Sequence, residues 1–353
     1  MLVNPLQKDL DFIFESTKDL FDELNGANIF VTGGTGFFGC WLLESFLWIR
    51  NKLGLNCKMH VLTRNPDAFK SKAPHLAADK GVSFYAGDVM DFPFLPGKFD
   101  YIIHAATEAS AKLTQEKPQL MHDTIVAGTK HVLEFAKHCG TRKLLFTSSG
   151  AVYGRQPPEI SHIDEEYAGE YTDIEGKSPY GLGKKIAEEI CIKATQENNF
   201  EVKIARCFAF VGPYLPLDIH FAIGNFILAG LRHEPIIING DGTPYRSYLY
   251  AADLMVWLWH ILLRGENCRP YNVGSEDAIN IVDLAGTVAK HFIPAPQINV
   301  LKKAVAKKQA ERYVPSTKRA CEELGLRQMV SLDEAIERTK EWNLYKIKRG
   351  KLC

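Results

Sequence analysis

Short apolar segments alternate with longer amphipathic segments through the first half of the chain. Apolar residues at helical spacing predict helices at about 38–51 and 120–138. The apolar segments around them, each about five residues long, are expected to form strands. These expected strands are 27–32, 58–63, 82–85, 101–105 and 143–148. The alternation predicts an α/β fold with a Rossmann-type, doubly wound parallel sheet, which binds ligands beyond the carboxyl ends of its strands.

The segments that flank this alternation have other patterns. Residues 6–24 carry apolar positions at helical spacing and predict an N-terminal helix that packs on the main fold. Residues 154–178 are rich in Pro, Gly, Asp, Glu and Tyr, which predicts a surface loop. A helix at 180–196 and a strand at 202–207 are expected to follow this loop.

The chain is expected to have three parts. From residue 212 onward it predicts loops, shorter helices and isolated strands such as 235–238, which is typical of a smaller lobe. The first part is then a helical extension, 1–25, and the second a dinucleotide-binding Rossmann domain that also holds the catalytic residues, 26–211. The third part, 212–353, is expected to be mainly a substrate-binding lobe, with some segments returning to the Rossmann domain.

Composition and charge exclude several classes of protein. With 46% apolar residues in a chain of 353, the protein can bury a large core. Lys+Arg and Asp+Glu are both 42, and this balance argues against a nucleic-acid partner. Residues 1–10 lack the pattern of a signal peptide, and the longest apolar run, 255–263, is too short to span a bilayer. We therefore expect a cytoplasmic protein without a membrane partner.

The eight cysteines are scattered and none forms a C-x-x-C pair. In a chain of this length, such spacing favours unpaired thiols in a reducing compartment over a disulfide scaffold. It also gives no reason to expect a metal site.

A glycine-rich turn follows the first expected strand and opens the first helix of the alternation. Gly33, Gly36 and Gly39 leave room for a tight turn and for close approach of a pyrophosphate to backbone N–H groups. The positive end of the helix dipole then faces the phosphates. The residues expected to bind the dinucleotide here are Gly33, Thr35, Gly36, Phe37, Phe38 and Gly39.

Residues after the next strands are expected to complete the cofactor site. An acidic residue after the second strand would favour NAD, but Arg64 stands there, which slightly favours NADP over NAD. Asp88, with Val89 beside it, follows the third strand and is placed to meet the adenine amine. His104, Ala105 and Ala106 end the fourth strand with small residues that leave space for the dinucleotide.

A candidate catalytic set follows the fifth strand. Tyr180 and Lys184 are four residues apart on an expected helix and so share one face. A nearby ammonium favours the phenolate form of tyrosine, which can accept the proton of a sugar hydroxyl while the cofactor takes the hydride. Ser149 ends the fifth strand and is placed to hold the same substrate oxygen by a hydrogen bond. Tyr180 and Lys184 are also expected to contact the cofactor.

Three segments, 33–39, 148–154 and 178–184, resemble the extended short-chain dehydrogenases/reductases, in their group of NAD(P)-dependent nucleotide-sugar epimerases and dehydratases. The resemblance covers about residues 27–340 and keeps the family's order of motifs. It implies a nucleoside-diphosphate sugar as substrate. It also implies a homodimer built on a four-helix bundle, to which the helices near 120–137 and 180–196 would contribute.

Two arginines are matched to the family's diphosphate-binding positions. Arg246 lies in a stretch, 240–250, that resembles the segment whose arginine grips the nucleotide diphosphate, and Arg312 corresponds to a second such arginine. Two guanidinium groups suit a diphosphate. Glu108, just after the fourth strand, is a further candidate to face the sugar.

The sequence departs from the family pattern at several positions. The 4,6-dehydratases of the family place Asp-Glu after the active-site hydroxyl, and its decarboxylases also use a glutamate there, whereas this chain has Gly150 and Ala151. Two asparagines of the pattern are replaced by Ile125 and Ala209, which affects how the sugar is placed.

Four functions stay open at this point. The complete Ser/Tyr/Lys set and the missing carboxylates favour an epimerase that works through a transient keto intermediate. Arg64 favours the alternative of an NADPH-dependent 4-ketosugar reductase. The third candidate is a 4,6-dehydratase with unusual acid/base residues, and the fourth is a catalytically idle dinucleotide sensor.

Overall fold

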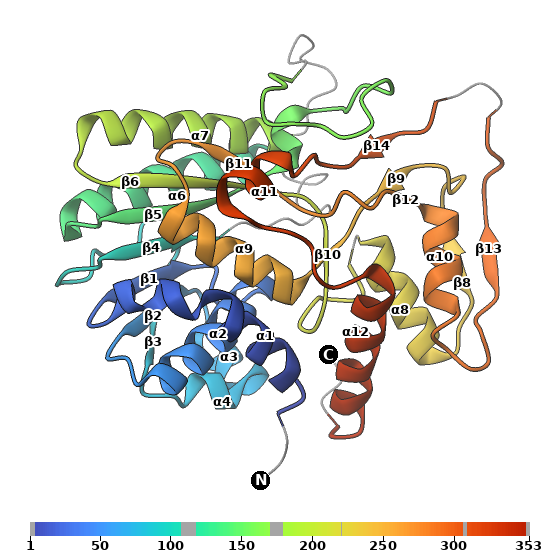
Figure 1. Cartoon of the computed structure of the whole chain (residues 1–353), viewed down its shortest axis with the longest axis horizontal. Coiled ribbons are helices and arrows are strands. Elements are labelled where there is room, and N and C mark those ends of the chain that lie inside the picture. Colours follow the sequence, from blue (N-terminus) through green and yellow to red (C-terminus); the bar gives the residue numbers. More distant parts are fainter. Residues whose placement is uncertain (1–3, 107–117, 170–178, 220, 306–308, 351–353) are drawn as a thin grey trace.

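A sheet of seven parallel strands forms the centre of the protein (Figure 1). The computed structural model describes residues 4–106, 118–169, 179–219, 221–305 and 309–350. The strands of this sheet are β1 (Asn28–Thr32), β2 (Lys58–Thr63), β3 (Val82–Ala86), β4 (Tyr101–His104), β5 (Lys143–Ser149), β6 (Glu201–Cys207) and β11 (Pro270–Val273). Their order in the sheet is β11-β6-β5-β4-β1-β2-β3, and every neighbouring pair is parallel. The predicted Rossmann-type fold is confirmed.

Helices cover both faces of the sheet because successive strand residues point to opposite sides. In β1, Ile29 and Val31 belong to a core that includes residues of α2 (Phe37–Leu53) and α9 (Ala251–Arg264). Phe30 between them packs with residues of α6 (Pro118–Cys139) and α7 (Pro179–Glu197) on the other side. The short helices α3 (Pro66–Lys72) and α4 (Pro74–Ala77) lie beside β3 at the sheet edge.

The expected N-terminal helix is two helices in the structure. α1 (Gln7–Thr17) is followed by a 3₁₀ helix, η1 (Lys18–Leu24). The Thr17 hydroxyl donates back to the carbonyl oxygen of Ile13 across 2.7 Å, the kind of local bond that competes with regular helix geometry. α1 packs on α2 and α9, as the apolar spacing predicts.

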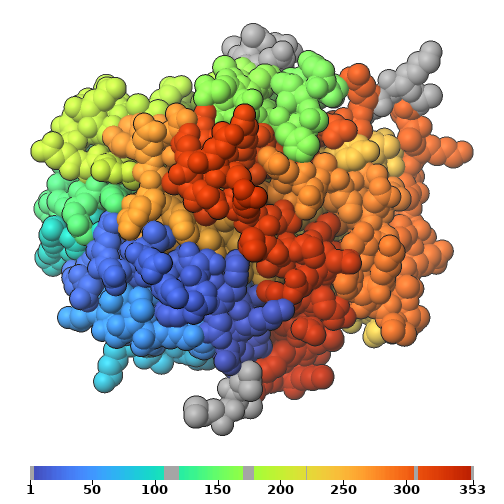
Figure 2. Space-filling model, viewed as in Figure 1, coloured from blue at the N-terminus to red at the C-terminus, as the bar shows by residue number. Residues whose placement is uncertain are grey.

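The first and last helices of the chain contact each other on one face of the molecule. The N-terminal helices and the last helix, α12 (Leu332–Ile347), lie side by side in the space-filling view (Figure 2). The buried carboxylate of Asp9 accepts the Tyr250 hydroxyl across 2.7 Å and pairs with the Arg338 guanidinium. Lys8 and Glu334 form a second, exposed pair at 2.9 Å.

The rest of the chain combines short helices with small sheets. They are β7 (Phe210–Val211), α8 (Ala222–Arg232), β8 (Ile236–Ile238), β9 (Tyr245–Arg246), β10 (Leu249–Tyr250), β12 (Ile279–Asn280), α10 (Ile281–Ala289), β13 (Ile298–Val300), β14 (Arg312–Tyr313) and α11 (Lys318–Leu324). The paired strands are β10 with β7, β12 and β14 with β9, and β13 with β8. β11 and α9, although late in the sequence, belong to the main sheet and its cover.

The segment after η2 (Gly150–Tyr153) is more deeply packed than the expected surface loop. Within its described part, 154–169, Gln156 and Ile163 are buried. The backbone N–H of Ile163 donates to the carbonyl oxygen of Val314 across 2.9 Å, and the carbonyl oxygen of Ile163 accepts the backbone N–H of Ser316 across 2.8 Å. Polar composition alone does not reveal such long-range backbone pairing; residues 170–178 of the predicted loop lie outside the described residues.

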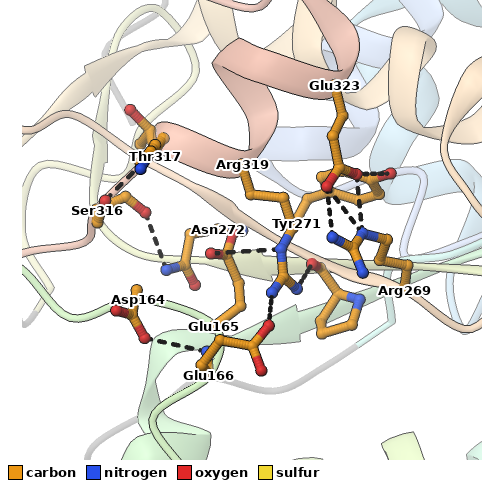
Figure 3. Close-up of polar contacts among 12 residues, drawn as sticks. Asp164, Glu165, Glu166, Arg269, Tyr271, Asn272, Ser316, Thr317, Arg319 and Glu323 are labelled. Carbon is orange, nitrogen blue, oxygen red and sulfur yellow. Dashed lines mark hydrogen bonds and ion pairs between the residues drawn. The ribbon is translucent and has the colours of Figure 1, made fainter.

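A polar cluster holds the same loop against the C-terminal part of the chain (Figure 3). Arg319, on α11, pairs with Glu166 and donates to the carbonyl oxygen of Pro270 across 2.9 Å. The Glu165 carboxylate accepts the backbone N–H of Asn272 across 2.7 Å. These contacts connect the loop, α11 and the edge strand β11.

Buried polar residues tie the ends of the central strands to α6. The His104 ring nitrogens contact the hydroxyls of Thr32, at 2.7 Å, and Thr129, at 3.2 Å. Burial lowers the pKa of His104 to about 3, since charging the ring would cost its solvation. The neutral ring therefore holds β1, β4 and α6 together beneath the carboxyl ends of the strands.

Replacing Arg338 by Met should lower the free energy of unfolding by about 3 kcal/mol, because it leaves the Asp9 carboxylate buried without its counter-charge. Denaturant unfolding at neutral pH measures this loss. The matched control is Lys8→Met, which removes an exposed pair and should cost about 0.5 kcal/mol or less. Equal losses in the two variants would contradict the importance of the buried pair.

His104 should make the protein sensitive to acid. Its folded pKa, about 3, lies below the ordinary value of 6.5, so the unfolded chain binds a proton that the folded chain excludes. The stability that neutral His104 confers is full above pH 6.5 and declines as pH falls towards 3, by about 1.4 kcal/mol per pH unit. Urea unfolding at a series of pH values should show a flatter acid slope for His104→Gln, and an unchanged slope would contradict this assignment.

Candidate active site

A cavity of about 1150 Å³ opens at the carboxyl ends of the central strands. Parallel sheets bind ligands at this edge because the loops after the strands diverge there. Most of the residues singled out from the sequence line this cavity. They are Gly33, Thr35, Gly36, Phe37, Phe38, Arg64, Asp88, Val89, Ala105, Ala106, Ser149, Tyr180, Lys184 and Arg246.

The glycine turn brings the backbone close to the cavity. Gly33 has a φ of +73°, and a Cβ there would lie 2.5 Å from the carbonyl oxygen of Ala105. A Cβ on Gly39 would lie 2.1 Å from the carbonyl carbon of Gly34, so this glycine permits packing of the turn on α2 and does not itself line the cavity. Gly36 caps α2, whose first N–H groups need acceptors. This cradle fits the pyrophosphate of a dinucleotide.

The far end of the cavity carries two cations and a carboxylate. Arg64 and Asp88 line it, as expected from their positions after β2 and β3. Lys72 of α3 also lines it and donates to the carbonyl oxygen of Thr35 across 2.9 Å. Sequence reasoning missed Lys72, because only the packing of α3 beside the turn brings it to the site.

His104 supports the cavity from below. Its side chain is 3% exposed and lies beneath the surface that Ala105 and Ala106 form. The prediction that these residues line the cofactor site therefore holds for Ala105 and Ala106, whereas His104 does not line the cavity. His104 acts through the buried contacts with Thr32 and Thr129 described above.

Lys184 is buried beside the candidate acid/base. Its side chain is 2% exposed, and its ammonium donates to the carbonyl oxygen of Thr147 across 2.7 Å. The same nitrogen lies 4.7 Å from the centroid of the Phe146 ring. Burial lowers the pKa of Lys184 to about 8, since the charged form loses solvation.

Burial has the opposite effect on the pKa of Tyr180. It raises that pKa to about 12, and a hydrogen bond with Ser149 offsets part of the rise. Burial dominates because an apolar site disfavours any new charge. The expectation that the Lys184 charge favours the phenolate stays a prediction. A phenolate here needs further positive charge or hydrogen-bond donors.

The helix that carries both residues is fixed from beneath. Glu188, one turn beyond Lys184, accepts the Ser148 hydroxyl and binds the Arg206 guanidinium, with a nitrogen–oxygen distance of 2.7 Å. Arg206 also donates to the Tyr153 hydroxyl across 2.9 Å. The i, i+4 spacing that identified Tyr180 and Lys184 extends to Glu188, and this was the signal available for it.

An aromatic wall lies against Gly150, the first of the two positions at which the family pattern has carboxylates. A Cβ on Gly150 would lie 2.6 Å from the Phe208 ring, so that ring requires glycine here. Phe208 packs on Tyr313, with ring centroids 4.7 Å apart, and both line the cavity together with Ala151. Sequence reasoning did not identify Phe208 or Tyr313.

The two matched arginines occupy different places. Arg246 lines the cavity, and its guanidinium donates to the carbonyl oxygen of Tyr245 across 2.8 Å. Arg312 is not among the described residues that line the cavity; its guanidinium lies 4.3 Å from the centroid of the Tyr245 ring. Its role in substrate binding stays a prediction. Glu108 lies outside the described residues.

Comparisons with known proteins agree with this architecture. Residues 29–274 match the NAD dependent epimerase/dehydratase family. The chain is 30% identical to UDP-glucuronic acid decarboxylase 5 of Arabidopsis thaliana over 317 residues, which is 90% of this chain and 89% of that protein.

Two solved structures have the same fold. The UDP-glucose 4-epimerase of Thermotoga maritima, solved with UDP-glucose, aligns with a TM-score of 0.76 and 22% identity over 91% of this chain and 99% of its own. The UDP-glucuronic acid 4-epimerase of Bacillus cereus, solved with UDP-glucuronic acid and NAD, aligns with a TM-score of 0.75 and 22% identity over 89% and 98%.

Among the described residues, no helix combines the length and apolar character that crossing a bilayer requires.

The family assignment rests on the Rossmann-type sheet, on the cavity at its carboxyl edge and on the match over most of the chain. This protein belongs to the NAD dependent epimerase/dehydratase family and is an enzyme of the extended short-chain dehydrogenase/reductase type.

Proposed function

We propose that this protein is an epimerase that acts on a sugar carried by a nucleoside diphosphate. One observation supports this most strongly: Ser149, Tyr180 and Lys184 line the same cavity as the glycine turn, while Gly150 and Ala151 offer no carboxylate beside them. This set can exchange a proton with a sugar hydroxyl. It lacks, at the family's usual position, the groups that eliminate water or assist decarboxylation.

The chain's own residues perform the proton chemistry. The Tyr180 oxygen accepts the proton of the sugar hydroxyl that becomes a carbonyl, and Ser149 holds that oxygen by a hydrogen bond. Lys184 contributes positive charge, since at neutral pH a pKa of about 8 leaves it mostly protonated. When bound, the nicotinamide ring supplies the reversible hydride acceptor.

An epimerase also needs room for its keto intermediate to present the other face. The cavity of about 1150 Å³ extends from the glycine turn to Arg246, so the dinucleotide and the sugar would share it. Arg246 is our candidate for the diphosphate, which would anchor the nucleotide while the sugar turns. A guanidinium suits this task because it binds phosphate oxygens with two parallel hydrogen bonds.

Two observations bear on the choice of cofactor. The family to which this chain belongs is NAD dependent, whereas Arg64 slightly favours NADP. The Bacillus cereus epimerase was solved with NAD, which supports NAD here. Arg64 and Lys72, which both line the far end of the cavity, support NADP, because cations there would suit a 2′-phosphate. Use of NADP accompanies the second candidate function, a 4-ketosugar reductase.

The relatives raise the further candidate of a UDP-glucuronic acid decarboxylase. Gly150 and Ala151 oppose it, since neither of the positions at which the family carries its carboxylates offers one here. The same feature disfavours a 4,6-dehydratase that works in the family manner. A catalytically idle sensor is disfavoured by the buried Tyr180 and Lys184, which a mere dinucleotide binder would not require.

Three more features accompany this proposal. α6 and α7 pack together along one face of the sheet, which supports a homodimer built on a four-helix bundle. The division into 1–25, 26–211 and 212–353 agrees with the location of the cavity between the sheet edge and residues such as Arg246 and Ile281. A cytoplasmic location would suit the scattered thiols, of which the seven described are unpaired.

The protein should retain its cofactor through purification, because an epimerase returns the hydride to the same sugar and has no need to exchange it. Acid release followed by chromatography identifies the cofactor. Incubation with UDP-, GDP-, CDP- and dTDP-sugars, followed by NMR, should reveal a product of unchanged mass. A cofactor-free protein that consumes NADPH only with 4-keto sugars would identify a reductase, and carbon dioxide release from UDP-glucuronic acid would identify a decarboxylase.

Tyr180→Phe should lower kcat by about 10²–10⁴-fold with little change in cofactor retention, because it removes only the hydroxyl that exchanges the proton. The matched control is Tyr85→Phe, which removes a phenol hydroxyl that contacts His60 outside the cavity. An unchanged rate in Tyr180→Phe would contradict the proposed proton transfer.

A further inference from the structure

Tyr214 stands at the corner of a turn, in a conformation that an aromatic residue rarely adopts. The turn runs from Gly212 to Leu215 and is closed by a hydrogen bond of 3.2 Å from the Leu215 backbone N–H to the Gly212 carbonyl oxygen. Pro213 is its second residue, and Tyr214, its third, has a φ of +70°. Turns with a positive φ at the third position normally place glycine or asparagine there, because a bulky side chain strains the backbone. Such a residue persists only where surrounding contacts hold it.

The Tyr214 side chain makes two of those contacts. Its hydroxyl donates to a carboxylate oxygen of Glu44, on α2, across 2.6 Å. Its ring packs on Trp342, on α12, with ring centroids 4.9 Å apart. Trp41, also on α2, donates its indole N–H to the carbonyl oxygen of Pro213 across 2.8 Å. Side chains of two helices therefore hold the corner, and a glycine in place of Tyr214 would lose two of the three contacts.

Glu44 is a buried carboxylate that the proposed reaction leaves unused. Its side chain is 5% exposed, and the oxygen that accepts the Tyr214 hydroxyl also lies 2.7 Å from the Nε2 atom of His75 on α4. A carboxylate removed from water is costly unless hydrogen bonds replace those it made to the solvent. Tyr214 supplies one of these bonds, so the carboxylate and the strained corner stabilise each other.

The residues that follow the corner form part of the cavity wall. Leu215 and Pro216 line the cavity, as do Phe221 and Ala222 at the start of α8. Gly224 permits close packing behind this wall, since a Cβ there would lie 3.3 Å from the carbonyl oxygen of Pro216. The corner thus joins the wall to α2, the helix that begins at the glycine turn.

We propose that Tyr214 is a positioning residue for the substrate. Its contacts with Glu44 and Trp342 hold residues 215–216 in place before the substrate binds. The inference rests on the proposed function, because it concerns the substrate side of that same cavity. A wall that is already ordered spares the complex the cost of ordering it, so these contacts should strengthen substrate binding. They should affect proton transfer little, since the catalytic residues come from β5 and α7.

The test variant is Tyr214→Phe in the full-length protein, which keeps the ring against Trp342 and removes only the hydroxyl. We expect KM for the nucleotide sugar to rise about tenfold, while kcat changes less than about twofold and the cofactor is retained. Tyr214→Gly suits the backbone of the turn better, yet it should raise KM at least as much, because it removes both side-chain contacts. An unchanged KM in Tyr214→Gly would overturn the proposal.

Two further variants separate positioning from a general loss of stability. Glu44→Gln keeps a side-chain oxygen that can accept the Tyr214 hydroxyl, so it should raise KM less than Tyr214→Phe does. The matched control is Tyr101→Phe, which removes a buried hydroxyl that donates to the Glu23 carboxylate across 2.9 Å, at the amino end of β4. It should lower the free energy of unfolding and leave KM unchanged. Equal rises in KM for Tyr214→Phe and Tyr101→Phe would contradict the positioning role.

Hydrogen–deuterium exchange provides a readout that needs neither substrate nor turnover. Backbone amides within 212–219 should exchange faster in Tyr214→Phe than in the wild type, and at the wild-type rate in Tyr101→Phe. A wild-type protein that turns over no nucleotide sugar would refute the epimerase proposal, while faster exchange in Tyr214→Phe would still support the ordering of the wall. In an active protein, unchanged exchange, or faster exchange without a rise in KM, would refute the role of Tyr214 alone.

Discussion

The buried carboxylate of Glu188 is the contact on which the catalytic geometry depends. It accepts the Ser148 hydroxyl and pairs with Arg206, and so fixes α7 against the ends of β5 and β6. Tyr180, Lys184 and Glu188 follow one another at intervals of four residues on this helix, so fixing one of them fixes the direction of all three. A rotation of α7 would remove Tyr180 from Ser149 and Lys184 from Thr147 together.

Burial makes both candidate catalytic groups costly to charge. It lowers the pKa of Lys184 to about 8 and raises that of Tyr180 to about 12, each against the charged form. The two groups therefore resist forming the ammonium–phenolate pair until a ligand adds charge or donors. This gives the protein a physical reason to ionise Tyr180 only when the site is filled.

The walls of the cavity differ in how they are built. Its floor comes from the sheet edge, where strand ends and the glycine turn leave the backbone exposed to a ligand. Its outer wall combines residues far apart in sequence, such as Phe208, Arg246 and Tyr313. Those residues depend on the C-terminal strands and on the packed loop after η2, which the cluster around Arg319 holds in place (Figure 3).

The sequence by itself determined the fold and brought the candidate catalytic residues to one site, because both depend on local patterns. Alternating apolar segments define the parallel strands, three glycines define the turn, and the spacing of Tyr180 and Lys184 defines one helix face. Only the tertiary structure decided the rest. Tyr313, Lys72 and the different positions of Arg246 and Arg312 result from contacts between segments far apart in the sequence, such as the pairing of β9 with β14 and the bond from Lys72 to Thr35. The rise in the pKa of Tyr180 has the same origin, since burial is a property of packing that no single position of the sequence reveals.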